Sequence, residues 1–348
     1  MPVSARSQAS STIREFDLIQ TLKRRYASPS PRIVRGMGDD AAVIASGPDR
    51  RYLVTTDLLA EGIHFDLRTA GFLDIGFRSA AASLSDIAAM GGTAEYLLVS
   101  LAIPRAGTGR QVEQLYDGMM AACRPHRVRL VGGDTSASRG GWFINVMLIG
   151  TAALGRILFR NGARIGDDLY VTGTLGDSQA GLQLLERPRR SVRSLSRRQR
   201  QFLVQRHLRP TARIREGLWL AQAAWASSAI DLSDGLSGDL RHLCTESRVG
   251  ALIARSALPI SLACRRYAES LGQEAERLAL AGGEDYELLF TVPRRHRTRF
   301  EEASARRRFQ MTRVGRILHA REGLCMTLPD GRQEPLPSSS YEHFRPSR

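Results

Sequence analysis

The stretch that decides the fold is Ser227–Leu240, which reads "SSAIDLSDGLSGDL". A short apolar run ends at Asp231, and a second carboxylate, Asp234, follows after one leucine and one serine. A glycine comes next, and the residues after it have the spacing of a helix. This order predicts a strand that ends in an acidic turn and leads into a helix. Binding sites of α/β folds lie in the loops at strand ends.

Four other segments, from distant parts of the chain, join an aspartate to an apolar run or to a glycine turn. They are "GMGDDAAV" at 36–43, "LVTTDLL" at 53–59, "SLSDIAAMGG" at 83–92 and "LVGGDTS" at 130–136. A single aspartate of this kind most often caps a helix or forms a turn. Five such units weaken that explanation when they are taken together, and we expect their carboxylates to converge.

Strand and helix patterns alternate along both halves of the chain. This interleaving predicts a mixed α/β architecture in each half. The length of 348 residues suits two domains of ordinary size. We place the boundary near Thr151–Gly155, with an N-terminal domain over 1–152 and a C-terminal domain over 153–348.

Composition indicates a globular protein, with 43% hydrophobic and 24% charged residues. No apolar run approaches the roughly 20 residues that span a bilayer. The first residues lack the apolar segment of a signal peptide. The four cysteines are scattered and form no CxxC pair, as expected of free thiols in a reducing compartment. We therefore expect a cytoplasmic protein without membrane contact.

The formal net charge of +15 suggests a polyanion as partner. However, Lys23 is the only lysine, so the excess reflects heavy use of arginine. The densest run, Arg187–Arg200, is expected to be a solvated insert leading into a helix. Nucleic-acid binding is the alternative for this run. Since aromatic residues are only 6% of the chain and none interrupts the run, we expect no nucleic-acid partner.

Converging aspartates would need counter-charge or protons. Two carboxylates about 4 Å apart repel by roughly 4 kcal/mol at an effective dielectric of 20. Oxygen-only ligands favour Mg²⁺, Ca²⁺ or Mn²⁺ over zinc, and Mg²⁺ held by carboxylates commonly shares its shell with phosphate oxygens. The glycine turns of "GMGDD", "GGD" and "SDG" give a phosphate close access to backbone N–H groups.

The sequence lacks the motifs of two large classes of phosphate-transfer enzymes, the Walker A loop and the protein-kinase segments. Lys23 follows no glycine-rich loop, and the protein-kinase segments and a GxSxG elbow do not occur. Arg160, in "LFRNGARIGDD", could replace the missing lysine because glycine turns flank it, although a surface arginine is the simpler interpretation.

The segment "LAGGEDYELLF" at 280–290 places two glycines and three acids before a strand. We expect Glu284 and Asp285 to face a site and Glu287 to point outward, a solvated tight turn being the alternative. His64 shares a turn with Glu61, where a histidine is more often structural than catalytic.

Together these motifs resemble the thiamine-monophosphate kinase family, and the resemblance covers nearly the whole chain. The matching segments are "EFDLI", "GMGDDAAV", "TTDLLAEGIHF", "SLSDIAAMG", "VGGDT", "GRILFRNGARIGDDLYVTGTLGDSQAGL", "HLRPTARI", "AIDLSDGLSGDL", "GGEDYELLF" and "YEHF". Several are long and all occur in order, so the match is specific.

The resemblance implies the two-domain fold shared with aminoimidazole ribonucleotide synthetase, dimerising through the N-terminal sheet. It implies Mg²⁺-dependent transfer of the γ-phosphate of ATP to thiamine monophosphate in the cleft between the domains, giving thiamine diphosphate and ADP, with no covalent nucleophile. Metal ligands are implied at Asp40, Thr55, Thr56, Asp57, Asp86, Asp134, Asp231 and Asp234. Nucleotide contacts are implied at Gly133, Asp134, Arg160 and Ser233, and substrate contacts at His64, Glu284 and Tyr341.

The alternative is another ATP-dependent enzyme of the same superfamily. Aminoimidazole ribonucleotide synthetase is the closest competitor in fold, but "GGEDYELLF" and "TDLLAEGIHF" point away from it. The hydrogenase-maturation member ends in a modified cysteine, whereas this chain ends "HFRPSR". The selenophosphate-synthesising member uses an early cysteine or selenocysteine, and the first cysteine here is Cys123.

Overall fold

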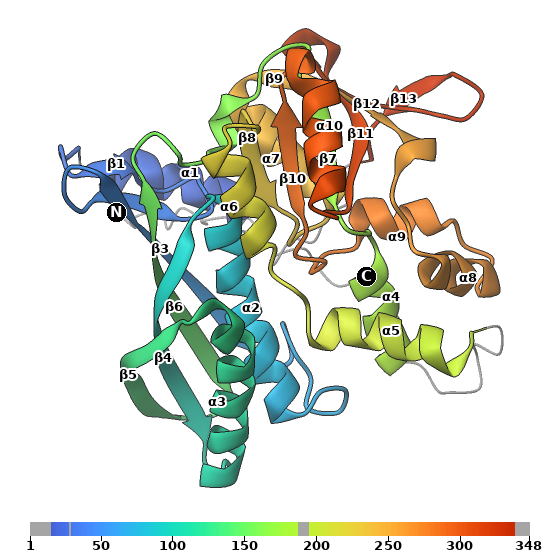
Figure 1. Ribbon diagram of the computed structural model, residues 1–348. Coiled ribbons are helices and arrows are strands. Elements are labelled where there is room, and N and C mark those ends of the chain that lie inside the picture. The colour runs from blue at the N-terminus through green and yellow to red at the C-terminus, as the bar shows by residue number, and fades with distance from the viewer. Residues whose placement is uncertain (1–14, 28, 187–194, 338–348) are drawn as a thin grey trace, which may run out of the picture.

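The computed structural model describes residues 15–27, 29–186 and 195–337, and within them the strands form two sheets (Figure 1). The first sheet has the order β1-β2-β3-β6-β4-β5. Its strands are β1 (Ile33–Arg35), β2 (Ala42–Ala45), β3 (Arg50–Ala60), β4 (Thr93–Pro104), β5 (Arg129–Ser138) and β6 (Phe143–Ala153). Within the described part of this sheet, only β4 and β5 pair in parallel. Strand β5 is last in the order and therefore lies at an edge of the sheet.

Two helices, α2 (Phe72–Ala89) and α3 (Gly109–Cys123), cover one face of this sheet. α3 begins at a capping box in which the Thr108 side chain accepts from the Gln111 N–H. The two helices pack so closely that a Cβ added to Gly76 would lie 1.9 Å from the Leu115 carbonyl oxygen. The same holds for Gly118 against the carbonyl oxygen of Leu73. The Ala-rich sequence of α2 therefore forms a helix buried on most sides.

The second sheet has the order β13-β12-β9-β11-β7-β10-β8. Its strands are β7 (Asp168–Thr172), β8 (Ser228–Asp231), β9 (Val249–Ala254), β10 (Leu288–Val292), β11 (Met311–His319), β12 (Leu324–Thr327) and β13 (Gln333–Pro335). Strand β10 runs antiparallel to both of its neighbours, β7 and β8, and this brings the end of β8 beside the start of β10.

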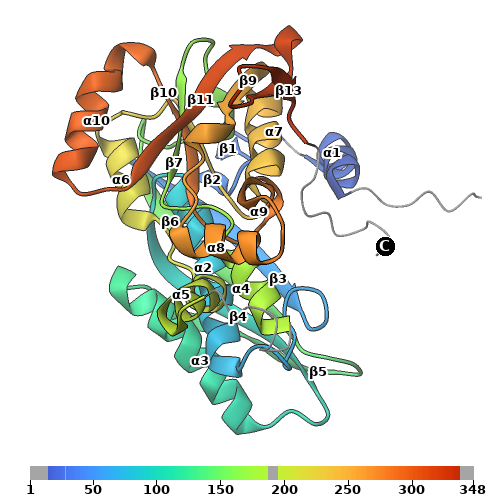
Figure 2. The same ribbon diagram turned by 90° about the vertical axis from the view of Figure 1, so that its right-hand side faces the viewer.

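Helices cover both faces of the second sheet (Figures 1 and 2). Leu169 and Val171 of β7 belong to one core cluster, with residues of α4 (Asp177–Glu186), α7 (Leu236–Ser247), α8 (Leu262–Ser270) and α9 (Ala275–Ala281). Tyr170, between them, belongs to the other cluster, with Phe300 of α10 (Arg297–Arg306) and residues of α6 (Ile214–Gln222). This alternation follows from the two-residue period of a strand.

The core cluster that contains Tyr170 also contains buried residues of the first sheet and of α2. α2 contacts both α6 and β8, so it joins the two halves of the molecule. Further helices are α1 (Glu15–Tyr26) and α5 (Arg197–Leu208), the latter starting at a capping box on Ser196. Residues 187–194 of the arginine run lie outside the described residues.

The prediction of mixed α/β architecture in both halves is confirmed. The opening stretch forms β8, an acidic turn and α7, in the expected order. Among the described residues, no helix combines the length and the apolar character that crossing a bilayer requires.

Candidate active site

Three of the expected aspartates converge from distant segments. Asp40 lies in the turn before β2, Asp86 in the last turn of α2, and Asp231 at the end of β8. One carboxylate oxygen from each lies within 4.8 Å of the others. Asp40 is 7% exposed and Asp231 is 3% exposed. The acidic turns therefore share a site, and it is mostly withdrawn from water.

Two carboxyl groups of this cluster, those of Asp86 and Asp231, resist ionisation. Burial, reinforced by the charge of Asp40, raises the pKa of Asp231 to about 8. Burial also raises the pKa of Asp86 well above its usual range, with further contributions from Asp57, Asp231 and Asp40. Near neutral pH the cluster must therefore hold protons or bind cations.

Strand β3 supplies two more polar groups on the side that faces α2. The Thr55 hydroxyl donates to Oδ2 of Asp86, and the Ser83 hydroxyl donates to Oδ2 of Asp57 at 2.5 Å. Burial raises the pKa of Asp57 despite its bond from Ser83. Thr56, between them, points to the other side, where its hydroxyl lies 3.1 Å from Oδ1 of Asn145.

Two arginines reach the acidic residues, namely Arg160 and Arg35, whose Nε lies 3.4 Å from Oδ2 of Asp39. Nη2 of Arg160 lies 2.6 Å from Oδ1 of Asp40. The other oxygen, Oδ2 of Asp40, is buried and has no hydrogen-bond partner among the described residues. A buried unpaired carboxylate oxygen is costly. Since two guanidinium groups cannot balance all the converging carboxylates, the carboxylate oxygens fit a hard divalent cation.

Two acidic members of the cluster were not recognised in the sequence. Burial and the neighbouring Asp40 raise the pKa of Asp39 to about 7. Asp239 of α7 is 2% exposed, and its Oδ2 accepts from the N–H of Asp234 at 3.1 Å. Both lie inside the quoted motifs. The helical spacing around Asp239 did not predict that its side chain would contact the backbone of the acidic turn at Asp234.

A cavity of about 950 Å³ lies beside the cluster, between the two sheets. Its acidic end includes Asp57 and Asp234, together with Ser233. His64 and Glu284 also line it. Further lining residues come from β3, α2, α4, α5 and the loop before β10, and they include Thr56, Arg78, Ala82, Gln179, His207 and Tyr286.

Glu284 faces this cavity on a backbone that few residues adopt. Glu284 has a φ of 64° and Tyr286 a φ of 51°, both in the left-handed region. Their N–H groups donate to the carbonyl oxygens of Ser233 at 2.8 Å and Leu232 at 2.9 Å. The acidic turn after β8 thus holds the "GGEDYE" segment in place. Such strain concentrates at functional sites.

The expectations for the other two acids of this segment were wrong. Asp285 is 2% exposed and faces the start of α4, where it accepts from the N–H groups of Gly176 and Ser178. Glu287 is fully buried, with carboxylate oxygens 2.8 Å from Arg206 and 2.5 Å from Arg213. Because helices cover both faces of the second sheet, a side chain turned away from the site still does not reach solvent.

Gly133 and Asp134 do not join the cleft of their own chain. They lie on edge strand β5, three strands from β3 in the sheet order, a separation of about 14 Å at the usual strand spacing. Asp134 is exposed. A Cβ on Gly133 would lie 1.8 Å from the Val99 carbonyl oxygen, so strand pairing alone requires this glycine. Tyr341 lies outside the described residues.

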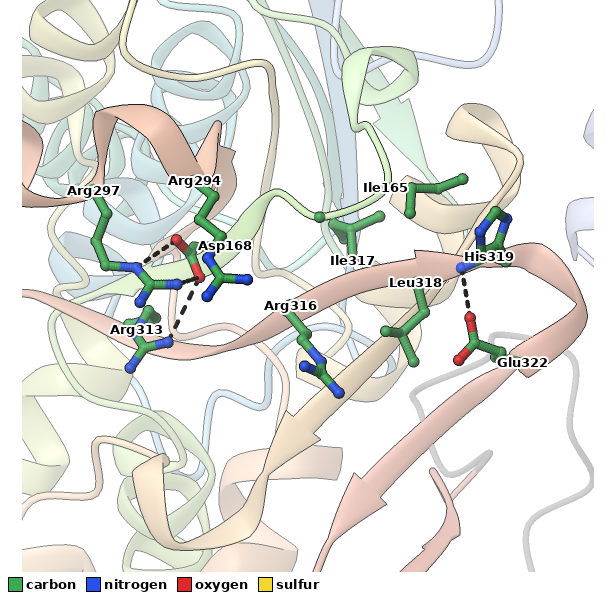
Figure 3. A pocket seen from close by; sticks show the side chains of 11 residues that line it. Ile165, Asp168, Arg294, Arg297, Arg313, Arg316, Ile317, Leu318, His319 and Glu322 are labelled. Carbon is green, nitrogen blue, oxygen red and sulfur yellow. Dashed lines mark hydrogen bonds and ion pairs between the residues drawn. The ribbon is translucent and has the colours of Figure 1, made fainter.

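A second, smaller pocket of about 330 Å³ lies on the C-terminal sheet (Figure 3). Arginines dominate its lining, and the buried carboxylate of Asp168 pairs with Arg297 at 2.5 Å and with Arg313 at 3.6 Å. No Phe, Tyr or Trp is among its lining residues. The pocket therefore lacks the Phe, Tyr or Trp rings on which single-stranded nucleic acids commonly stack, and it does not favour the nucleic-acid alternative.

Family models match both halves of the chain. Residues 38–152 match the AIR synthase related protein, N-terminal domain, and residues 164–324 match the C-terminal domain of the same family. Thiamine-monophosphate kinase of Escherichia coli (strain K12) is 37% identical over 332 residues, covering 95% of this chain and 98% of the relative. That of Bacillus subtilis (strain 168) is 31% identical over 331 residues, covering 95% of this chain and 99% of the relative.

Solved structures agree with these matches. AaThiL complexed with AMPPCP and TMP superposes with a TM-score of 0.81 at 35% identity, covering 95% of this chain and 97% of that one. Thiamine-monophosphate kinase from Stenotrophomonas maltophilia K279a gives a TM-score of 0.73 at 35% identity, covering 91% and 95%. The chain therefore belongs to the thiamine-monophosphate kinase family, within the AIR synthase related proteins.

Proposed function

We propose that the protein transfers the γ-phosphate of ATP to thiamine monophosphate, giving thiamine diphosphate and ADP. The observation that carries this proposal is the convergence of Asp40, Asp86 and Asp231 beside a cavity large enough for small-molecule ligands. The relatives named thiamine-monophosphate kinase and the structure complexed with AMPPCP and TMP support the identity of both substrates.

Mg²⁺ is the metal that we propose for the acidic end of the cavity. Its supply of positive charge would offset the repulsion between two phosphate groups. The residues that would hold it are Asp40, Thr55, Asp57, Asp86, Asp231 and Asp234, whereas the hydroxyl of Thr56 points to the other side of β3. The unpartnered Oδ2 of Asp40 and the raised pKa values of Asp86 and Asp231 support a cation at this position.

The chain itself contributes positioning and charge. An oxygen of the acceptor phosphate attacks the γ-phosphorus in line, the bond to the β–γ bridging oxygen breaks, and ADP leaves with that electron pair. The acceptor oxygen is already anionic near neutral pH, so no protein base has to remove a proton. Arg160 is the nearest guanidinium to the cluster and would face the nucleotide, while Glu284 and His64 would face the other end of the substrate.

A homodimer through the N-terminal sheet is part of the proposal. The face of that sheet away from α2 and α3 exposes Tyr52, Leu58, Tyr96 and Phe143, at 38–55% of their surface. Exposed apolar side chains grouped on one face favour association. Asp134 lies on the same face, in register with Ser100. A dimer would therefore bring Asp134 against the second subunit.

A cytoplasmic location also stays a prediction. Its motivation is the state of the cysteines: Cys123, Cys244 and Cys264 are buried and free, and Cys325 is a free thiol with partial exposure. Burial raises the pKa of the Cys123 and Cys244 thiols to about 12, which keeps both groups protonated and unreactive.

The test is direct. Purified protein is incubated with ATP, Mg²⁺ and thiamine monophosphate, and thiamine diphosphate is measured by chromatography. We expect product from thiamine monophosphate and none from free thiamine, which lacks the acceptor phosphate. Absence of thiamine diphosphate, or equal phosphorylation of both compounds, would overturn the proposal. Formation of aminoimidazole ribonucleotide in a parallel assay would favour the related synthetase activity instead.

A further inference from the structure

The wall of the cavity around Glu284 contains a buried group of charged and polar side chains that the proposed mechanism does not use. Arg78 of α2 and His207 of α5 are 4% and 3% exposed, and both line the cavity. Arg78 donates to the carbonyl oxygen of His64, and its Nη2 lies 3.4 Å from Oε1 of Glu284. It therefore contacts both described residues that were expected to meet the substrate.

The hydrogen bonds fix the state of His207. Its Nε2 lies 2.8 Å from Nη1 of Arg78. Since a guanidinium can only donate, Nε2 must accept and carries no proton. The proton is therefore on Nδ1, which lies 3.1 Å from the Ser178 hydroxyl and 3.5 Å from Oε2 of Glu284. Burial and the charge of Arg78 favour the same neutral form.

One carboxylate thus has a different donor beside each of its oxygens. Arg78 lies beside Oε1 and the Nδ1–H of His207 beside Oε2. The Glu284 side chain keeps 29% of its surface open toward the cavity. Its backbone is held by the carbonyl oxygen of Ser233. Both ends of Glu284 are therefore fixed, while part of the carboxylate stays open for a ligand.

We propose that Arg78 and His207 are positioning residues that hold the Glu284 carboxylate against the ring end of thiamine monophosphate. This inference rests on the proposed function. The acidic cluster occupies the phosphate end of the cavity, so the cationic, amino-bearing rings fall near Glu284. An ionised carboxylate complements such rings in charge and as a hydrogen-bond acceptor. Arg78 places a positive charge beside this carboxylate, and His207 fixes its orientation.

The test separates binding of the two substrates. Arg78→Gln and His207→Leu are each expected to raise KM for thiamine monophosphate about tenfold or more and to leave KM for ATP within about twofold. His207→Gln can accept from Arg78 and donate to Glu284, so it is expected to restore most of the lost affinity. The matched control is Arg209→Gln, since Arg209 also joins the end of α5 to α2, through Asp74, but does not line the cavity.

A double-mutant cycle tests whether Arg78 acts through Glu284. In a Glu284→Gln background, Arg78→Gln is expected to add little to the rise in KM, because the partner that it positions is already lost. Titration of thiamine monophosphate without ATP, followed by calorimetry, gives the same comparison without turnover. Thermal unfolding of each variant excludes loss of the fold, and Arg78→Lys replaces Arg78→Gln if the latter does not fold.

The outcomes are distinct. Wild-type protein that makes no thiamine diphosphate defeats the proposed function itself. Active wild type with unchanged KM in folded Arg78 and His207 variants overturns the positioning roles alone. Additive effects of Arg78→Gln and Glu284→Gln, or equal rises in KM for both substrates, do so as well.

Discussion

At the scale of single residues, the cleft combines acids in opposite environments. Asp40, Asp86 and Asp231 lie together with little counter-charge, so burial and mutual repulsion raise the pKa values of Asp86 and Asp231. Glu287 is buried just as deeply, but Arg206 and Arg213 outweigh the effect of burial and lower its pKa. The aspartate cluster is destabilising without further positive charge and therefore suits a cation. The carboxylate of Glu287, in contrast, already has its counter-charges within the chain.

Replacement of one carboxylate in the cluster should separate function from folding. We expect Asp57→Asn to reduce turnover by about 100-fold or more, because a metal shell loses one negative charge. The metal-free variant should unfold at the same temperature as wild type or slightly higher, since burial already disfavours the charged form of Asp57. Thermal unfolding with and without Mg²⁺–ATP measures both effects, and the ligands should stabilise wild type more than the variant.

The control for this experiment is Asp330→Asn. Asp330 lies in an exposed turn and does not line the cavity. Turnover of Asp57→Asn equal to wild type at limiting Mg²⁺ would show that this aspartate is a structural residue and would contradict the metal site.

His207 gives a prediction about pH. Burial and Arg78 lower its pKa to about 3, against a usual value near 6.5. Between these values the unfolded chain binds a proton that the folded protein excludes, so this contribution to stability is present above pH 6.5 and is lost as the pH falls toward 3. His207→Gln removes the titration. From pH 7 to pH 5, wild type should lose about 2 kcal/mol more unfolding free energy than the variant.

Urea denaturation at the two pH values measures this difference. Comparison with the variant cancels the opposite contributions of the raised aspartates, which are the same in both proteins. His319→Gln, at an exposed histidine, is the control and should follow wild type. Parallel pH dependence of wild type and His207→Gln would show that His207 is protonated in the folded protein.

At the scale of secondary-structure elements, the ion pairs of Glu287 hold helices to the second sheet. Glu287 precedes β10, Arg206 lies in α5, and Arg213 directly precedes α6. Thr172 of β7 donates to the same carboxylate at 2.6 Å. Four segments thus meet at one buried side chain, and of these only α5 and α6 are neighbours in sequence.

Removal of this side chain should be strongly destabilising. We expect Glu287→Ala to lower the unfolding free energy by about 3–5 kcal/mol, because it leaves two partly buried guanidinium groups without a counter-charge. Chemical denaturation measures the loss. Glu302→Ala breaks an exposed pair with Arg306 and should cost less than about 1 kcal/mol. A similar small cost at both positions would contradict the role given to Glu287.

At the scale of the whole molecule, the described helices cover the N-terminal sheet on one face only (Figure 1). The open face carries Tyr96 and Phe143 on adjacent strands β4 and β6. We expect the protein to be a dimer by light scattering at micromolar concentration. Tyr96→Asp or Phe143→Asp should shift it toward monomer, because a two-fold interface places each new charge twice in an apolar contact. A monomeric wild type would count against the dimer.

The sequence alone determined the architecture and the acidic turns. The order of strand, acidic turn and helix at Ser227–Leu240 could be predicted because strand alternation, turn residues and helix spacing are local properties of the chain. The convergence of Asp231 with other acidic turns was also predictable in kind, since sites of α/β folds lie at strand ends, but the sequence did not show that Asp86 would reach the site from the end of a helix. The distances and the supporting Thr55 and Ser83 were not predictable either.

Only the tertiary structure decided which polar residues are buried and what each one faces. Glu287 was expected to point outward because strand alternation gives a direction but does not say that a helix covers that side. Arg78 looked like one arginine among many, and only the packing of α2 against α5 shows that it meets Glu284 and His207. Charge partners far apart in sequence depend on how whole elements pack, and no local pattern of residues encodes that packing.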